Sequence, residues 1–488
     1  MNKKAIRLLC IATVAILTLS GCQENPEESV VISKNDGHFD ANVVVSATES
    51  NAPDATQELK QSDFFSSTDD TVKFCIDLSD TVTAANMPVL EVVPHYITEA
   101  EAQQVAHALF GDVSFYEWQH WSDELLSKAE IQSKIARWSE FTSQEAIDAL
   151  WGFPQIDSIP VVKKFIEEYT EKLQVAQSHS NKVPCQWKFK KAPYYLFSAT
   201  EAAQCSTKNE DDMLKATTTV NGVPFTLQFG TRNEDDYKAN YIRAYIDSDS
   251  PLSIDKRYFT AQLCRTEKPT DNQIEYAALR AQEILDELGL GQWVINQNEV
   301  VEQFYGDTPE YIIDIKAVPV LAGVPAIYQA AISNLTEKDV YASNYQISSV
   351  NIQFSPNGEL IYFSLDSPID IENVVNDNVA VISMNELLYL AKTNLMHSSF
   401  PQYDVQMQAD PKSKNIECEI NIHKVKYALA RIRVPNTEES YYYVPSLTLY
   451  GDAEFYNKTT GNFCFSYQDL TLLSLNAVDG TIINNTNS

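Results

Sequence analysis

The spacing of hydrophobic and polar residues predicts a helix-rich first part of the folded chain. Strand candidates at residues 72–78 and 88–96 precede a helix that Thr98 and Glu101 begin with a capping box. Apolar residues then recur every three or four positions, which is typical of amphipathic helices. They predict a helical insertion near residues 122–179.

After residue 183 the apolar residues alternate with polar ones, which is the period of a strand. The dipeptide Asn221-Gly222 separates two such runs and predicts a two-residue hairpin. The runs Val350–Phe354 and Glu359–Ser364 are expected to pair through Asn357-Gly358. Capped amphipathic helices begin near Thr270 and Ser383. The chain therefore predicts an α+β fold with two or three modules, each an amphipathic helix packed on an antiparallel sheet.

These patterns divide the chain into five segments. They are a signal peptide at 1–21, an acidic flexible tether at 22–70, an N-terminal α+β and helical domain at 71–182, a central strand-rich α+β domain at 183–375, and a C-terminal α+β unit at 376–488. Residues 23–70 hold eleven acidic residues and too few apolar ones to fold alone. Treated as a coil, this tether reaches roughly 35–40 Å.

The N-terminus has the features of an export signal. Lys3, Lys4 and Arg7 precede a short apolar stretch, residues 8–19, which suits a signal peptide better than a transmembrane helix. The stretch ends in Leu19-Ser20-Gly21-Cys22, which resembles the lipobox of bacterial lipoproteins. That resemblance implies cleavage before Cys22, acylation of Cys22, and a lipid-anchored position on the extracytoplasmic face of the cell membrane. The alternative is an ordinary secretory signal with a chance cysteine.

The net negative charge of the chain limits the classes of molecule that it can bind. The whole chain has a formal charge of −31, and loss of the three basic signal residues leaves 33 basic against 67 acidic residues, near −34. Nucleic acid is excluded as a partner because phosphate binding needs basic patches. Acidity of this kind keeps an extracellular protein soluble and collects cations loosely.

The mature chain has six cysteines besides Cys22, and they are widely scattered. They are Cys75, Cys185, Cys205, Cys264, Cys418 and Cys464. Their spacing excludes the usual clustered zinc and redox motifs. An even number outside the cell allows disulfides, with Cys185–Cys205 and Cys418–Cys464 as plausible pairs, and buried thiols are the alternative.

Five stretches resemble an uncharacterised family of lipoproteins from Gram-positive bacteria. They are Pro88–His95 with Ala108–Asp112, Tyr441–Pro445 with Tyr450-Gly451, and Leu475–Ile483. The last of these, with its Asp479-Gly480 turn, is also similar to the end of PepSY-type modules and of the sensor-kinase regulators YycH and YycI. The resemblance implies a location and a fold, and transfers no catalytic residue.

One aromatic cluster is a candidate ligand site. Trp118 and Trp121 could stack on a sugar ring, with Glu117 and His120 making polar contacts. A carboxylate pair nearby would suit glycan cleavage. The alternative is that both tryptophans seal a junction between the first sheet and the helical block.

Two Asn-Glu-Asp-Asp runs bracket the hairpin at Asn221-Gly222, whose open end should bring them together. Their carboxylates are those of Glu210, Asp211, Asp212, Glu234, Asp235 and Asp236. Calcium binds six to eight such oxygens, but neither run has the spacing of a dedicated calcium loop. Two solvated acidic loops are the alternative.

The sequence contains none of the G-x-S-x-G, P-loop or H-E-x-x-H motifs, so no enzyme class is assigned. We expect a binding or regulatory module for another extracytoplasmic protein. A glycan-binding or glycan-cleaving surface protein and a calcium-stabilised structural protein are the alternatives.

Overall fold

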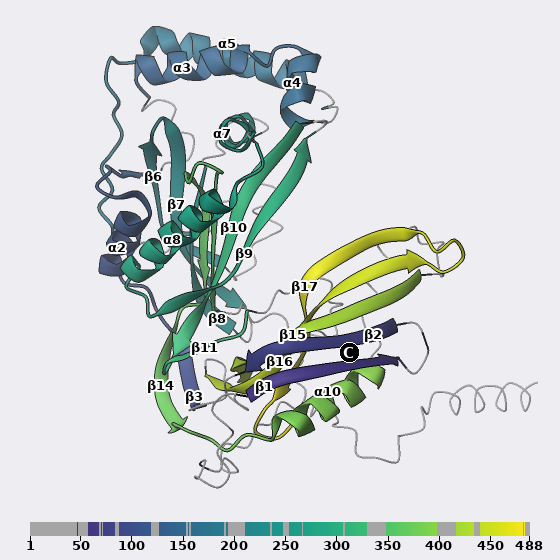
Figure 1. Cartoon of the computed structure of the whole chain (residues 1–488). Helices are drawn as coiled ribbons and strands as arrows, with labels where there is room; N and C mark the ends of the chain where they lie inside the picture. The colour runs from purple at the N-terminus through teal and green to yellow at the C-terminus, as the bar shows by residue number, and fades with distance from the viewer. Residues whose placement is uncertain are drawn as a thin grey trace, which may run out of the picture.

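The structure is a computed structural model of the chain, shown in Figure 1. Its strands form two separate sheets, one covered by several helices and the other by a single helix. It describes residues 46, 57–67, 70, 72–82, 87–118, 126–152, 155, 158–189, 192–193, 210–234, 237–246, 253–265, 267–305, 308–328, 348–397, 416–433, 440–481 and 483.

One sheet has seven strands and is built from both ends of the chain. Its strands are β1 (Gln57–Ser66), β2 (Val72–Val82), β3 (Val89–Pro94), β14 (Ile369–Asn376), β15 (Ile416–Arg433), β16 (Tyr441–Asn457) and β17 (Phe463–Asn476). Their order is β1-β2-β15-β16-β3-β14, and β17 pairs with β16. β2 and β15 run parallel, whereas the other pairs are antiparallel. We call this sheet and its helix the seven-stranded lobe.

The other sheet has ten strands from the middle of the chain. They are β4 (Tyr116–Glu117), β5 (Ala192–Pro193), β6 (Glu210–Val220), β7 (Val223–Glu234), β8 (Tyr237–Ile246), β9 (Trp293–Tyr305), β10 (Thr308–Leu321), β11 (Val324–Pro325), β12 (Ser349–Phe354) and β13 (Leu360–Asp366). The order is β11-β10-β12-β13-β8-β7-β6-β4, with β5 on β6 and β9 on β10. All these pairs are antiparallel. With its helices it forms the ten-stranded lobe.

The described residues form seven helices. They are α2 (Glu99–Phe110), α3 (Lys128–Ser139), α4 (Gln144–Trp151), α5 (Ser158–Val175), α7 (Ile254–Cys264), α8 (Asp271–Glu287) and α10 (Met384–His397). None of them is both long and apolar enough to cross a membrane.

Each sheet buries one face against helices. In the ten-stranded lobe, Val105 of α2 and Ile284 of α8 share one core with Phe229 of β7. In the seven-stranded lobe, Leu387 of α10 packs in a second core with Phe74 of β2. Burial of apolar side chains on this scale is the main source of stability for both lobes.

A helical block of α3, α4 and α5 extends from the ten-stranded lobe (Figure 1) and packs with α7. Trp138 of α3 is 1% exposed and meets Tyr169 of α5 edge to face at 4.7 Å between ring centroids. The Trp138 indole N–H donates to the buried carboxylate of Asp255 on α7 at 3.0 Å. This bond ties the block to the lobe.

The structure confirms the α+β class and several local predictions. Both hairpins are present, and Asn221 and Gly222 have the positive φ angles that a type I′ turn needs. The β12–β13 hairpin has a longer loop, between the paired residues Phe354 and Leu360, and only Gly358 of its Asn-Gly pair has a positive φ. The capping box at the start of α2 is also present, since Thr98 N–H donates to the Glu101 carboxylate at 2.7 Å.

Other predictions were wrong. Residues 57–66, placed in the tether, form β1, because their alternating side chains complete the seven-stranded sheet beside β2. The sheets also cut across the predicted boundaries at residues 182/183 and 375/376, since β1–β3 share a sheet with β15–β17. Of the two alternatives left open for Cys418 and Cys464, the structure has free thiols, with Cys418 buried in the core and Cys464 exposed. Cys205, the predicted partner of Cys185, lies outside the described residues.

Candidate functional site

The chain crosses between the two lobes at two adjacent places. One crossing runs from β3 to α2, and the other runs from β13 to β14 through Ser367 and Pro368. His95 N–H donates to the Pro368 carbonyl at 2.8 Å, and Ser367 N–H donates to the Asn240 carbonyl at 3.0 Å. The Asn240 side chain, on β8, donates to the His95 carbonyl at 2.9 Å. The two crossings and β8 are therefore held as one unit, which we call the joint.

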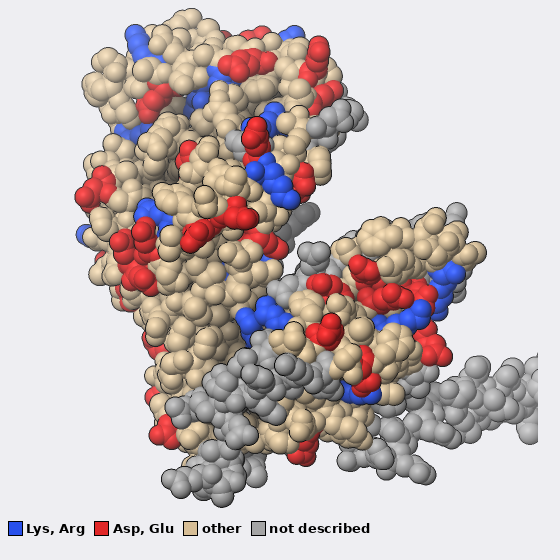
Figure 2. Space-filling view, in the orientation of Figure 1, with Lys and Arg blue, Asp and Glu red and all other residues tan. Residues whose placement is uncertain are grey.

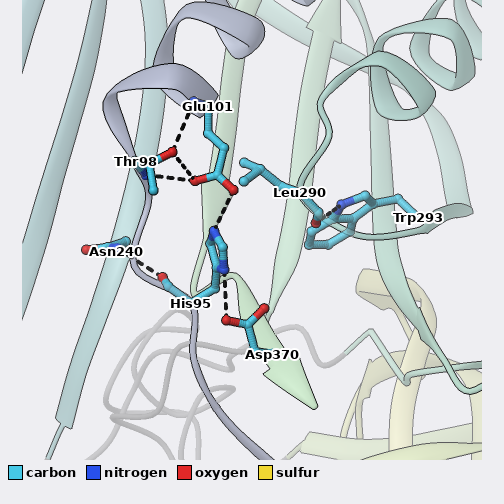
Figure 3. A network of polar contacts seen from close by, with 7 residues as sticks. All are labelled: His95, Thr98, Glu101, Asn240, Leu290, Trp293 and Asp370. Atoms are coloured by element: carbon cyan, nitrogen blue, oxygen red, sulfur yellow. Dashed lines mark hydrogen bonds and ion pairs between the residues drawn. The ribbon is translucent and has the colours of Figure 1, made fainter. Parts of the chain in front are cut away.

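The His95 side chain lies between two carboxylates from different lobes (Figure 3). Its Nδ1 is 2.9 Å from Asp370 Oδ2, on β14 of the seven-stranded lobe. Its Nε2 is 3.1 Å from Glu101 Oε1, on α2 of the ten-stranded lobe. The ring thus links the first turn of α2, in the ten-stranded lobe, to the start of β14, in the seven-stranded lobe.

The two carboxylates differ in how firmly they are held. Glu101 Oε2 accepts from the backbone N–H and the hydroxyl of Thr98 at 2.7 and 2.8 Å. The Asp370 side chain is 59% exposed, against 23% for Glu101. Glu101 is fixed by the helix cap, whereas Asp370 stands at the solvent side of the joint.

The charges in the joint shift two pKa values. Burial, the largest single influence, lowers the pKa of His95, but hydrogen bonds and charge from Asp370 and Glu101 outweigh it and raise the pKa. Burial likewise raises the pKa of Glu101, but the Thr98 bonds and His95 outweigh it, so this pKa is lowered. Both shifts favour an imidazolium between two carboxylates.

This geometry suits a switch better than a catalytic base. A general base needs a nitrogen that reaches substrate, and both His95 nitrogens are engaged by carboxylates. Ser367, in the adjacent crossing, has a φ of +51° and is 2% exposed. A non-glycine residue in this region is strained, and such strain is concentrated at functional sites.

The lobes also share apolar contacts close to the joint. Leu90 and Val92 of β3 form one cluster with Val318 of β10 and Tyr443 of β16, all 0–1% exposed. Figure 3 also shows two residues of the core of the ten-stranded lobe, Leu290 and Trp293. The indole N–H of Trp293 donates to the Leu290 carbonyl at 3.0 Å. The shared apolar cluster holds the lobes together irrespective of charge.

The aromatic candidate site is described only in part. Glu117 lies in β4, and Trp118 is half-buried at the edge of β6, where its ring carries Lys215 Nζ at 3.7 Å from the centroid. His120 and Trp121 lie outside the described residues. Since Lys215 occupies one face of Trp118, a sugar ring would have to stack on the opposite face.

The acidic candidate site is described only as backbone. The hairpin register pairs Glu210 with Arg232 and Asp212 with Gly230, so its open end brings the first run next to residues 230–232. Asp235 and Asp236 lie outside the described residues, as does Cys22. Among the side chains that are described, no group of three or more His, Cys, Asp or Glu could hold a metal ion.

The joint was missed at the sequence level. His95 stands six residues before Glu101 but 275 residues before Asp370, so no local motif contains all three. One sequence signal could have found part of it, namely a histidine that follows a strand and directly precedes a capping box. The cap uses only one carboxylate oxygen of Glu101, so the other oxygen remains available to a second donor such as His95.

Comparisons with known proteins add little to this description. No family model and no curated protein matches the chain. A solved structure of an uncharacterized protein from Eubacterium rectale is similar over 87% of this chain and 93% of its own, with 10% sequence identity and a TM-score of 0.35.

Proposed function

We propose that the chain is a lipoprotein, anchored through Cys22 on the extracytoplasmic face of a membrane, that acts as a binding or regulatory module for another surface protein. The observation that supports this role best is the joint, where Glu101 of one lobe and Asp370 of the other meet at His95. A body of two lobes with an ionisable contact between them is suited to passing a change in one lobe to the other.

The order of elements supports a different role for each lobe within this proposal. Thirty-four residues separate Cys22 from Gln57, where β1 begins at the edge of the seven-stranded sheet. The seven-stranded lobe is therefore the one tied to the membrane, and the ten-stranded lobe is the one presented to a partner.

The surface suggests what such a partner would look like. Figure 2 shows acidic side chains spread over both lobes, interspersed with fewer basic ones. On α8, Tyr276 and Leu279 are 57% and 61% exposed, one helical turn apart. A protein partner with basic groups around an apolar patch would be complementary in charge and would be steered toward this face.

Photo-cross-linking on intact cells tests this role. A photoreactive amino acid would replace Leu279 on α8, and matched controls would replace the exposed Phe64 of β1 and Tyr389 of α10. We expect mass spectrometry to find one recurrent membrane or wall protein joined through position 279. Equal linkage of abundant neighbours from all three positions would refute the proposal.

A further inference from the structure

We propose that His95 is a pH-dependent clamp between the two lobes, which holds both crossings when the imidazole is protonated and releases Asp370 when it is neutral. The ring nitrogens lie 2.9 Å from Asp370 and 3.1 Å from Glu101, and both neighbours are acceptors when ionised. Two such contacts need two N–H donors, which only the imidazolium has.

Loss of one proton to solvent leaves one N–H and one lone pair on the ring. The lone pair then faces a carboxylate oxygen at hydrogen-bond distance, and that contact becomes repulsive. One of the two carboxylates must therefore move away from the ring.

The structure identifies Asp370 as the carboxylate that moves. Glu101 is held by two bonds from Thr98, while the Asp370 side chain is 59% exposed and can turn toward water. Neutral His95 thus keeps its proton on Nε2, toward Glu101. The crossing from β3 to α2 stays attached to the ten-stranded lobe and loses its side-chain contact with β14.

The groups that control this titration are few. Among the described residues, the charges that act on His95 are Asp370 from β14 and Glu101 from α2, whereas β8 contributes the uncharged amide of Asn240. Both carboxylates stabilise the imidazolium, so release occurs as the pH rises above the ordinary range for histidine. The shared apolar cluster contains no carboxylate and no histidine, so the lobes stay joined while the joint loosens.

Hydrogen exchange of the purified full chain between pH 5.5 and 8.5 tests the clamp. The reporters are the amides of His95 and Ser367, which donate to Pro368 and Asn240 across the joint. After correction for the chemical pH dependence of exchange, we expect their protection to fall by about tenfold, since one charge-assisted bond is lost. The amide of Ser355, which donates to Glu359 in the β12–β13 hairpin, is the internal reference and should not change.

The Asp370→Asn variant makes the test specific. Its side-chain amide can donate to the unprotonated Nδ1, so the protection of both reporters should stay constant across the pH range. Asp112→Asn is the matched control, because Asp112 pairs with the exposed His107 at 3.3 Å outside the joint and should leave the response intact.

Three outcomes overturn the clamp. They are a wild-type protein without a pH response, an Asp370→Asn variant that responds like wild type, and a reference amide that loses protection in parallel. A nitrogen-15 spectrum of His95 at high pH should show the proton on Nε2, and a proton on Nδ1 would also contradict it. No partner or membrane is present in these measurements, so their failure would remove the pH response of the joint, whereas cross-linking at position 279 tests the binding of a partner separately.

Discussion

Arg257 and Glu310 form a two-pronged ion pair in the interior of the ten-stranded lobe. Arg257, on α7, is 4% exposed, and its guanidinium donates to both carboxylate oxygens of Glu310, on β10, at 2.5 and 2.7 Å. Arg257 Nε also donates to the carbonyl of Leu150 at the end of α4 at 2.9 Å. One arginine thus joins the sheet to the helical block.

Replacing one partner of this pair should be strongly destabilising. In Arg257→Met, the Glu310 carboxylate stays buried with only Arg265 to offset its charge, so we expect a loss of about 3–5 kcal/mol in the free energy of unfolding. Chemical denaturation measures this loss. Arg280→Met is the control, since the exposed Arg280–Glu283 pair should contribute less than about 1 kcal/mol. Similar losses in both variants would contradict the interpretation.

Gly230 should tolerate no side chain while Tyr241 is present. The two residues are paired across β7 and β8, and a Cβ on Gly230 would lie 2.3 Å from the Tyr241 ring. We expect Gly230→Ala to lower the free energy of unfolding by about 1–3 kcal/mol through overpacking. Adding Tyr241→Leu should recover part of this loss in thermal unfolding, whereas simple additivity of the two changes would argue against a direct clash.

The thiols should separate into two classes of reactivity. Cys75 and Cys464 are exposed, whereas Cys264 and Cys418 are buried, and burial raises the pKa of each buried thiol to about 12. Because the thiolate is the reactive form, maleimide at pH 7 should label the exposed pair and leave the buried pair unlabelled until unfolding. Peptide mass spectrometry identifies which cysteines carry the label. A Cys418–Cys464 disulfide in the native protein would contradict this structure.

The joint should also influence global stability in a pH-dependent way. The pKa of His95 is raised in the folded state, so its contribution is fully present below the ordinary value of 6.5 and is lost as the pH rises through the folded pKa. The pKa of Glu101 is lowered, so its contribution is present above 4.5 and is lost as the pH falls through the folded value. The joint is therefore strongest between these two values.

The variant His95→Gln should reveal this dependence. Near pH 5.5 we expect it to be less stable than wild type by about 1 kcal/mol, and the difference should shrink toward pH 8.5. Urea denaturation at a series of pH values measures it. A difference that stays constant with pH would indicate a packing role for His95.

Local elements were predictable where one residue pair determines the geometry. Asn221-Gly222 fixes a hairpin because both positions accept positive φ, and Thr98 with Glu101 fixes a helix start. Helix α7 was missed because its N-cap, Ser253, makes no side-chain cap bond. Its buried Asp255 and Arg257 also give it the charge pattern of an exposed segment.

Pairing between strands that are far apart in the sequence could not be predicted from local patterns. β2 pairs with β15 in parallel, Cys418 beside Val72, so the first strands were assigned to a domain of their own. β9 was missed because its stretch Gln297–Glu299 is polar throughout, so it lacks the apolar–polar alternation of a half-exposed strand. The joint needed the same pairing information, because Asp370 reaches His95 only through the register of β14 on β3.

The central claim, a lipid anchor at Cys22, is tested most directly by the mass of the N-terminal peptide from protein purified out of membranes. We predict a peptide that begins at Cys22 and carries a diacylglyceryl group on the thiol. The variant Cys22→Ala should lose the lipid and leave the membrane fraction. A mature chain that begins at another residue, or an unmodified Cys22, would contradict the account.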